Sequence, residues 1–141
     1  MSTSSTSVRA TKLTLSLRKV AIVLAELDLP HEIEDVQFAD VKKPDFLKIN
    51  PNGRMPAIHD PNRDLTLWES GAIIEYLVEV YDKKQKLSFP AGSNEAYLAK
   101  QWLYYQVSGQ GPYFGQVSTA TTILSNARFS GAHIMPRLSF S

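Results

Sequence analysis

Two short groups of residues in the middle of the chain suit the binding of a small peptide. Met55-Pro56 opens a stretch that reads as a strand, and Glu69-Ser70 stands where a helical pattern begins. A cis bond before Pro56 would turn the main-chain N–H and C=O of Met55 outward, where an extended peptide can pair with them as an added strand. The helix start at Ser70 offers N–H groups and a positive dipole end to a carboxylate, and Glu69 can hold an ammonium group.

Each of these features also has a simpler interpretation when it is taken alone. Ser70 is more often only a helix N-cap, and a Met-Pro bond is more often trans. A single Glu69 is most often a solvated surface acid. Their order and spacing after a βαβ unit favour a ligand site, which would hold a peptide with both an α-amino and an α-carboxyl group.

The elements that must hold these residues follow the order β-α-β-α-β-β-α, which is the order of a thioredoxin-like α/β domain. In KLTLSL the alternating leucines favour a first strand, and the helical spacing of apolar residues in RKVAIVLAELDL predicts the crossover helix. The predicted elements are strands over 12–17, 31–38, 55–60 and 65–69, helices over 18–29 and 70–82, and a helical turn over 44–49.

A linker over 82–93 separates this domain from a more helical part. A new helix is predicted to start near Ser93, with Leu98, Trp102 and Tyr105 on one face. The pairs Ser108-Gly109 and Gly111-Pro112 are expected to interrupt it. One further helix is predicted over 117–128, and residues 127–141 show no usable period.

Composition excludes several classes of function. The chain has 141 residues, 43% of them hydrophobic and 21% charged, with a net charge of +1 and no cysteine. The low net charge gives no electrostatic case for nucleic acid or an anionic membrane, and no apolar run is long enough to span a bilayer. The lack of cysteine excludes disulfides and Cys-ligated zinc, so any thiol chemistry must use a thiol that the ligand brings.

Four separated blocks resemble fungal glutathione transferases, nearest the branch related to the yeast nitrogen-catabolite-repression regulator. In chain order they are KVAIVLAEL, KKPDFLKINPNGRMPAIHD, LTLWESGAIIEYLVEVYD and QWLYYQVSGQGPYFGQ, within residues 18–116. The resemblance implies a cytoplasmic transferase that uses glutathione as co-substrate and no metal. Its implied activity is attack of the glutathione thiolate on a small electrophile, or thiol–disulfide exchange with glutathione.

The resemblance also implies roles for particular residues. Met55 would make the main-chain pairing to the cysteinyl unit of glutathione, before a cis Pro56. Glu69 and Ser70 would hold the γ-glutamyl end, and Arg54 would line the same site. The absence of cysteine agrees with a nucleophile that comes from the ligand.

The residue that activates the thiol is ambiguous, because two alignments of the N-terminal part are open. Without a gap, Ser16 falls where this branch commonly has an activating Asn, and its hydroxyl could donate to a thiolate. The first strand would then lie within TSSTSVRAT, which is a poor strand sequence. If LTLSL is the first strand instead, the activating loop is deleted and Ser16 ends a strand or caps a helix. We favour the second alignment.

The expected organisation is a thioredoxin-like glutathione-binding domain over 12–86, followed over 93–141 by the start of an all-α glutathione-transferase domain. The family's helical domain is longer, and from about residue 117 the chain no longer resembles it, so we expect a truncated chain. Much apolar surface should then be uncovered, and the homodimer of the family becomes doubtful. A non-catalytic regulatory module of the same fold and an inactive truncated product are the alternatives to a conjugating enzyme.

Overall fold

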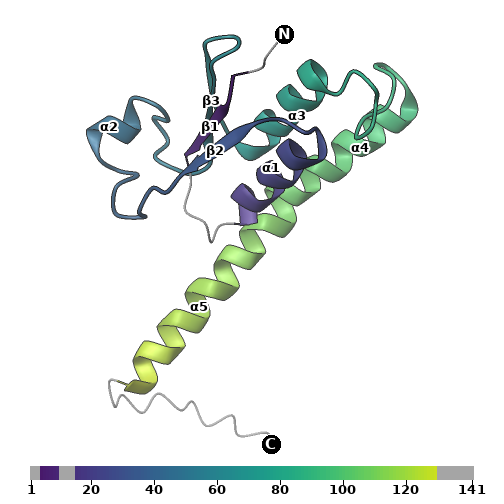
Figure 1. The fold of residues 1–141 in the computed structure, drawn as a ribbon. Coiled ribbons are helices and arrows are strands. Elements are labelled where there is room, and N and C mark those ends of the chain that lie inside the picture. Colours follow the sequence, from purple (N-terminus) through teal and green to yellow (C-terminus); the bar gives the residue numbers. More distant parts are fainter. Residues whose placement is uncertain (1–3, 10–14, 130–141) are drawn as a thin grey trace, which may run out of the picture.

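The computed structural model describes residues 4–9 and 15–129 (Figure 1). Its elements follow the predicted order β-α-β-α-β-β-α and then continue as a long helical rod. They are β1 (Thr6–Arg9), α1 (Leu15–Glu26), β2 (His31–Glu34), α2 (Pro44–Leu47), β3 (Ala57–Asp60), β4 (Leu65–Trp68), α3 (Ser70–Tyr81), α4 (Asn94–Tyr105), the π-helical turn η1 (Gln106–Gln110) and α5 (Gly111–Phe129).

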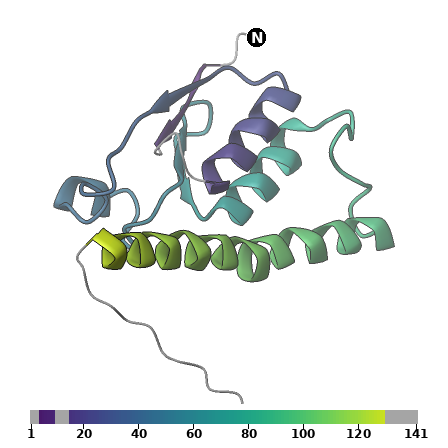
Figure 2. The same cartoon turned by 90° about the horizontal axis from the view of Figure 1, so that it is seen from below.

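The four described strands form one mixed sheet in the order β2-β1-β3-β4. β1 and β2 are parallel because α1 provides the crossover between them, whereas β3 pairs antiparallel with both β1 and β4. Helices α1 and α3 pack together on one side of the strands, and α2 lies on the other side (Figure 2). The α/β prediction of a thioredoxin-like domain is confirmed.

The core lies between the central strands and the pair of helices. Val8 of β1 and Ile58 of β3 are fully buried against α1 and α3. Each helix contributes apolar residues at helical spacing to this layer, so one stripe of each faces the sheet. The buried helical residues are Leu17, Val20, Leu24, Ile73 and Leu77.

The predicted first strand over 12–17 is wrong. β1 is Thr6–Arg9, so the sheet reaches closer to the N-terminus than residue 12, and α1 begins at Leu15. The alternation of leucines was misleading because Leu17 belongs to the helical stripe that continues in Val20 and Leu24. The segment 10–14, which includes the remaining part of that predicted strand, lies outside the described residues.

Other details differ from the predicted elements, and one agrees. The last helix, α5, begins at Gly111 rather than at 117, so Gly111-Pro112 opens this helix. β2 ends at Glu34 rather than at 38. Ser70 is the first residue of α3, and the N-cap is Glu69. The predicted break at Ser108-Gly109 is a π-helical turn, η1, after which the helix continues. The Met55-Pro56 bond is cis, as considered from the sequence.

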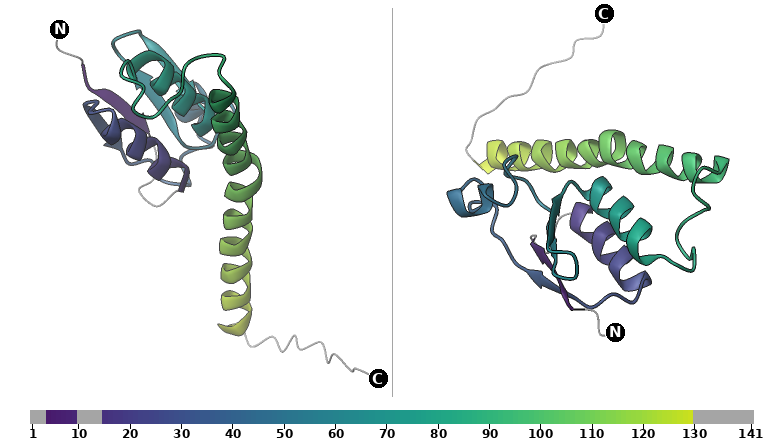
Figure 3. Two further views of the ribbon diagram at one scale, coloured as in Figure 1. Left: turned by 90° about the vertical axis from the view of Figure 1, so that its right-hand side faces the viewer. Right: turned by 90° about the horizontal axis from the view of Figure 1, so that it is seen from above.

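The rod formed by α4, η1 and α5 runs alongside α1 and α3 and extends beyond them (Figure 3). As predicted, α4 starts after Ser93, whose side-chain oxygen accepts from the Ala96 N–H at 3.2 Å. The rod's large side chains remain mostly exposed, as expected for a helix with little to pack against. Trp102 is 64% and Tyr113 is 69% exposed. No helix among the described residues is long and apolar enough to cross a membrane.

A buried carboxylate connects the hairpin to α3. Asp60 ends β3 and is fully buried, and both of its oxygens accept hydrogen bonds. Oδ1 accepts from the Asn62 main-chain N–H and side-chain Nδ2, each at 2.9 Å. Oδ2 accepts from the Tyr76 hydroxyl at 2.6 Å and from the Tyr81 hydroxyl. Burial works to raise the pKa of Asp60, but these donors outweigh it and hold that pKa below its ordinary value.

A second buried carboxylate organises the linker between α3 and α4. Asp82 accepts from the main-chain N–H groups of Lys86 and Leu87 at 2.7 and 2.8 Å, and from the Ser88 hydroxyl at 2.8 Å. Burial opposes ionisation of Asp82, yet these donors leave its pKa below the ordinary value. The Lys86 ammonium group then reaches α1, where it donates to the Glu26 carbonyl at 2.6 Å.

We expect Asp60→Asn to lower the free energy of unfolding by about 1.5–3 kcal/mol. The amide of this variant has one oxygen that can accept hydrogen bonds, whereas the carboxylate has two. Its NH₂ group would therefore face either the two tyrosine hydroxyls or the two donors of Asn62. Urea unfolding followed by tryptophan fluorescence measures the change. The matched control is Asp64→Asn in the same hairpin, because that exposed residue already has φ 48°, which Asn tolerates. Equal stability of the two variants would contradict the role given to Asp60.

The same carboxylates predict an acid limit to stability. Because the folded-state pKa values of Asp60 and Asp82 are depressed, the unfolded chain binds more protons than the folded one as the pH falls below about 5. Their contribution to the free energy of unfolding should therefore be fully present near neutral pH, and it should be lost as the pH drops through this range. Burial and the Asp60 charge raise the pKa of Tyr76 and Tyr81, so stability should also fall above about pH 10. Urea titrations across pH test both limits.

Candidate functional site

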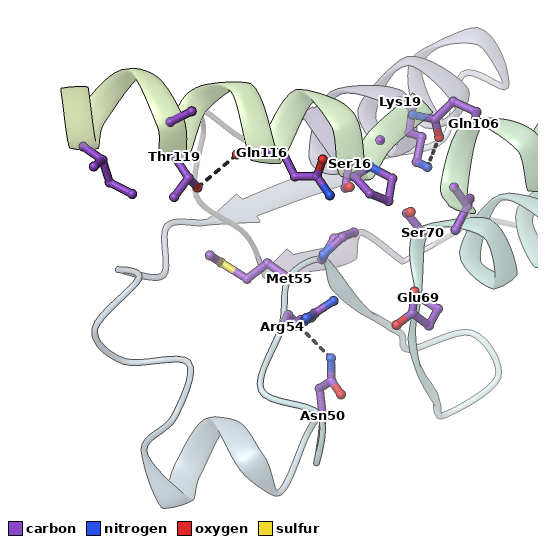
Figure 4. Close-up of a pocket in the computed structure, with 17 residues that line it drawn as sticks. Ser16, Lys19, Asn50, Arg54, Met55, Glu69, Ser70, Gln106, Gln116 and Thr119 are labelled. Atoms are coloured by element: carbon purple, nitrogen blue, oxygen red, sulfur yellow. Dashed lines mark hydrogen bonds between the residues drawn. The ribbon is translucent and has the colours of Figure 1, made fainter. Parts of the chain in front are cut away.

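A cavity of about 710 Å³ lies where the start of α1, the loop before β3, the start of α3 and the helical rod meet. The side chains labelled in Figure 4 converge on it from all four. All the candidate ligand-site residues from the sequence line this one cavity, although three separate segments of the chain supply them. They are Ser16, Arg54, Met55, Pro56, Glu69 and Ser70.

Hydrogen bonds from the Asn50 side chain stabilise the loop that carries Arg54, Met55 and Pro56. This side chain is only 1% exposed. Its Nδ2 donates to the Arg54 carbonyl at 2.6 Å, and its Oδ1 accepts from the Asn52 N–H at 3.0 Å. Gly53 takes the positive φ of 59° that the turn requires, a conformation that glycine adopts without cost. The loop thereby places the cis Met55-Pro56 step directly before β3, at the end of this strand.

Glu69 has an unusual backbone conformation where α3 begins. Its φ of 72° lies in a region that costs a non-glycine residue about 1–3 kcal/mol and that is concentrated at functional sites. Its carbonyl accepts from the Ile73 N–H at 2.9 Å, whereas its exposed side chain caps no helical N–H group. Ser70 follows and is buried at 5% exposure. This geometry places an acid and the first turn of a helix on the same wall of the cavity.

Another wall belongs to α1 and η1. Ser16 and Lys19 lie one turn apart on α1, so both can face the cavity. The half-buried Lys19 ammonium group donates to the Gln106 side-chain oxygen of η1. Burial lowers the pKa of Lys19 below its ordinary value, and the negative charge of Glu69 compensates for only part of this effect. Lys19 and Glu69 therefore influence each other within one cavity.

The last wall is the inner side of α5, and it carries no charge. It consists of small, apolar or neutral polar residues, which are Gly111, Pro112, Gly115, Gln116, Thr119, Ala120 and Ile123. Val107 of η1 continues this wall toward α3. The charged residues among those that line the cavity are Lys19, Arg54 and Glu69. The charged lining residues thus come from α1, the loop before β3 and the start of α3, whereas the side formed by α5 is neutral.

The sequence patterns do not single out the other lining residues as part of a site, among them Lys19, Asn50 and Gln106. Lys19 falls within the predicted helix over 18–29, Gln106 follows the predicted helix face of Trp102 and Tyr105, and Asn50 lies between two predicted elements. The one signal for Lys19 was its spacing of three residues from Ser16 on a helix. For Gln106 there was no local signal, because its contact with Lys19 joins positions 87 residues apart.

The position of Ser16 bears on the two alignments left open by the sequence. The strand β1 lies within TSSTSVRAT, and Ser16 is in the first turn of α1 at the cavity. The preferred alignment, with LTLSL as the first strand and no intervening loop, is therefore wrong. The gap-free alignment agrees with this arrangement, and the role of Ser16 itself remains a prediction.

Comparison with known proteins identifies relatives of the α/β part. The family described as "Glutathione S-transferase, N-terminal domain" matches residues 17–80. The glutathione S-transferase-like protein tpcF of Aspergillus fumigatus is 67% identical over 100 residues, which are 71% of this chain and 44% of that protein. The protein URE2 of Candida maltosa is 42% identical over 103 residues, which are 70% of this chain and 31% of that protein.

Solved structures agree with this relationship. The glutathione transferase URE2P8 of Phanerochaete chrysosporium, solved with oxidized glutathione, matches 84% of this chain and 54% of its own with a TM-score of 0.78 and 42% identity. The chain spans less than half the length of the curated relatives named above. Residues 17–80 therefore match the N-terminal domain of glutathione S-transferases, and the chain is similar there to the fungal transferases and URE2 proteins.

Proposed function

We propose that the cavity binds glutathione and that the chain conjugates the glutathione thiol to a small electrophile. The observation that carries this proposal is the convergence of Arg54, the cis Met55-Pro56 step and the strained Glu69-Ser70 turn on one cavity. Structures solved with glutathione or its derivatives among the chain's neighbours add support. Because the chain spans only part of its relatives, the activity is proposed for the chain rather than transferred from them.

Complementary groups would hold the two ends of the tripeptide. The γ-glutamyl unit carries an ammonium and a carboxylate group, and Glu69 with the first turn of α3 offers a partner for each. The main chain of Met55 would pair with the cysteinyl unit as an added strand. Arg54 would face the glycyl carboxylate, which a guanidinium group binds well.

The chemical step requires a thiolate. The S–H bond breaks, the proton leaves to solvent, and the sulfur keeps the electron pair. That pair then forms a bond to an electrophilic carbon, and a leaving group such as a halide departs with the electrons of its own bond. A free thiol has a pKa of about 8.5, so donors that stabilise the thiolate raise its population near neutral pH. The Ser16 hydroxyl is the proposed donor.

The second substrate would contact the neutral wall of the cavity. Small residues such as Gly115 and Ala120 leave room there, and Ile123 adds apolar surface. None of the α5 residues in this wall carries a charge. This composition favours an uncharged electrophile, because a charged one would lose hydration without gaining a partner.

Isothermal titration should detect glutathione binding to the full chain. We expect Glu69→Gln to weaken binding at least about tenfold, because the ligand's ammonium group loses a charged partner. The amide is close to isosteric, so the backbone at this position keeps its shape. Glu79→Gln, on an exposed position of α3, is the matched control and should bind as the wild type does. No heat at millimolar glutathione would refute the proposed site.

Conjugation to an aromatic halide tests the catalytic part separately. We expect Ser16→Ala to reduce kcat/KM about ten- to a hundredfold, because one hydrogen bond to a charged group is worth about 1.5–3 kcal/mol. Glutathione affinity should change much less than the rate. Steady-state assays with both substrates measure the effect.

The control for this assay is Ser125→Ala on α5. Its hydroxyl donates to the Thr121 carbonyl at 2.8 Å and lines no part of the cavity, so conjugation should be unchanged. An unchanged rate in Ser16→Ala would remove Ser16 from the mechanism. Glutathione binding without any conjugation by the wild type would favour the alternative of a non-catalytic module.

A further inference from the structure

Lys19 is a charged cavity residue to which the proposed function assigns no task. It lies one helical turn after Ser16 on α1, and its ammonium group donates to Gln106 of η1. A lysine ammonium carries three N–H donors, so one bond to Gln106 leaves two others for the cavity. A partly desolvated cation of this kind is poised to receive an anion.

Among the residues that the structure describes, few charged groups share the environment of Lys19. Glu69 at the start of α3 acts on its charge, and Arg54 lines the cavity from the loop before β3. Farther along α3, Glu75 is engaged by Lys100 at 3.4 Å and by the Tyr104 hydroxyl at 3.1 Å. Neither η1 nor α5 contributes a charged residue to the cavity lining.

Glutathione would change this charge balance. Once the ligand's ammonium group binds Glu69, the negative charge that acts on Lys19 is neutralised. The first turn of α3 takes the γ-glutamyl carboxylate and Arg54 the glycyl carboxylate, so the thiolate is the remaining anionic group of the ligand. Ser16 is the donor proposed for it, and Lys19 lies on the same side of the same helix.

We propose that the Lys19 ammonium group, held in place by Gln106, stabilises the thiolate of bound glutathione together with Ser16. This inference rests on the proposed glutathione site and adds a charge to its mechanism. The lowered pKa of Lys19 agrees with a cation that lacks full hydration before the ligand arrives. Gln106 is a positioning residue, because it acts on the thiolate only through Lys19.

The decisive experiment measures the pKa of the bound thiol. Glutathione at saturating concentration is titrated with pH in the presence of the full chain, and the ultraviolet absorbance of the thiolate is recorded. An opposite charge within about 4–6 Å shifts a pKa by about 1–3 pH units. We therefore expect Lys19→Met to raise the pKa of the bound thiol by at least about one pH unit. Lys19→Arg keeps the charge and should retain most of the effect.

Two further variants separate this role from a structural one. Gln106→Leu removes the acceptor but not the cation, so the pKa of the bound thiol should rise less than in Lys19→Met. Arg18→Met removes a neighbouring exposed charge of α1 that lines no part of the cavity, and the pKa should be unchanged. Thermal unfolding shows whether each variant is folded. If Lys19→Met does not fold, Lys19→Gln replaces it.

Binding of S-methylglutathione distinguishes the possible failures, because this ligand has no ionisable thiol. We expect equal affinity of the wild type and Lys19→Met for it. Weaker binding to Lys19→Met, together with an unchanged pKa of the bound thiol in glutathione, would overturn the inference and assign Lys19 to a carboxylate. If neither glutathione nor S-methylglutathione binds the wild type, the glutathione site itself fails, and this inference fails with it.

Discussion

The cavity depends on the close contact between η1 and the start of α3. A side chain at Gly71 would place its Cβ only 3.2 Å from Val107 Cγ2, so the absence of a side chain lets the rod approach the first turn of α3. Beside this contact, Lys19 donates to Gln106, and Glu75 binds Lys100 and Tyr104. Without this docking the cavity would lose the walls that η1 and α5 provide, and Glu69 and Ser70 would lie on an open surface. The helical rod therefore completes a site that the α/β domain only begins.

Within the α/β domain, buried polar groups hold the elements that present the site. Asp60 joins the β3–β4 hairpin to α3, and Asp82 organises the chain that leaves α3. Asn50 does the same for the loop before β3. Such groups are costly to bury unless every oxygen and N–H finds a partner, and among the described residues no buried side-chain nitrogen or oxygen lacks one. They give the loops a definite shape that apolar packing alone would not specify.

The ionic side of the cavity and its neutral side come from different parts of the fold. α1, the loop before β3 and the start of α3 supply Lys19, Arg54 and Glu69, whereas η1 and α5 supply only uncharged residues. A zwitterionic peptide would find its partners on the first side, and a neutral molecule would fit against the second. Most of the rod's large side chains outside the cavity remain exposed, including Trp102 and Tyr113. The rod thus contributes to the domain through a short central section.

The sequence alone predicted the order of the elements and singled out the two turns that line the cavity. Helical spacing predicted α1 and α3, turn residues predicted the β3–β4 hairpin, and the Met55-Pro56 and Glu69-Ser70 pairs were recognised because their chemistry is local. It failed where one pattern suited two structures: the leucines before Val20 fit a strand or a helix, and packing against β1 and β3 decided for the helix. The pairing of Lys19 with Gln106 and the position of α5 over the cavity were decided only by tertiary structure. Contacts between positions so distant in the chain depend on how whole elements pack, and no local pattern encodes them.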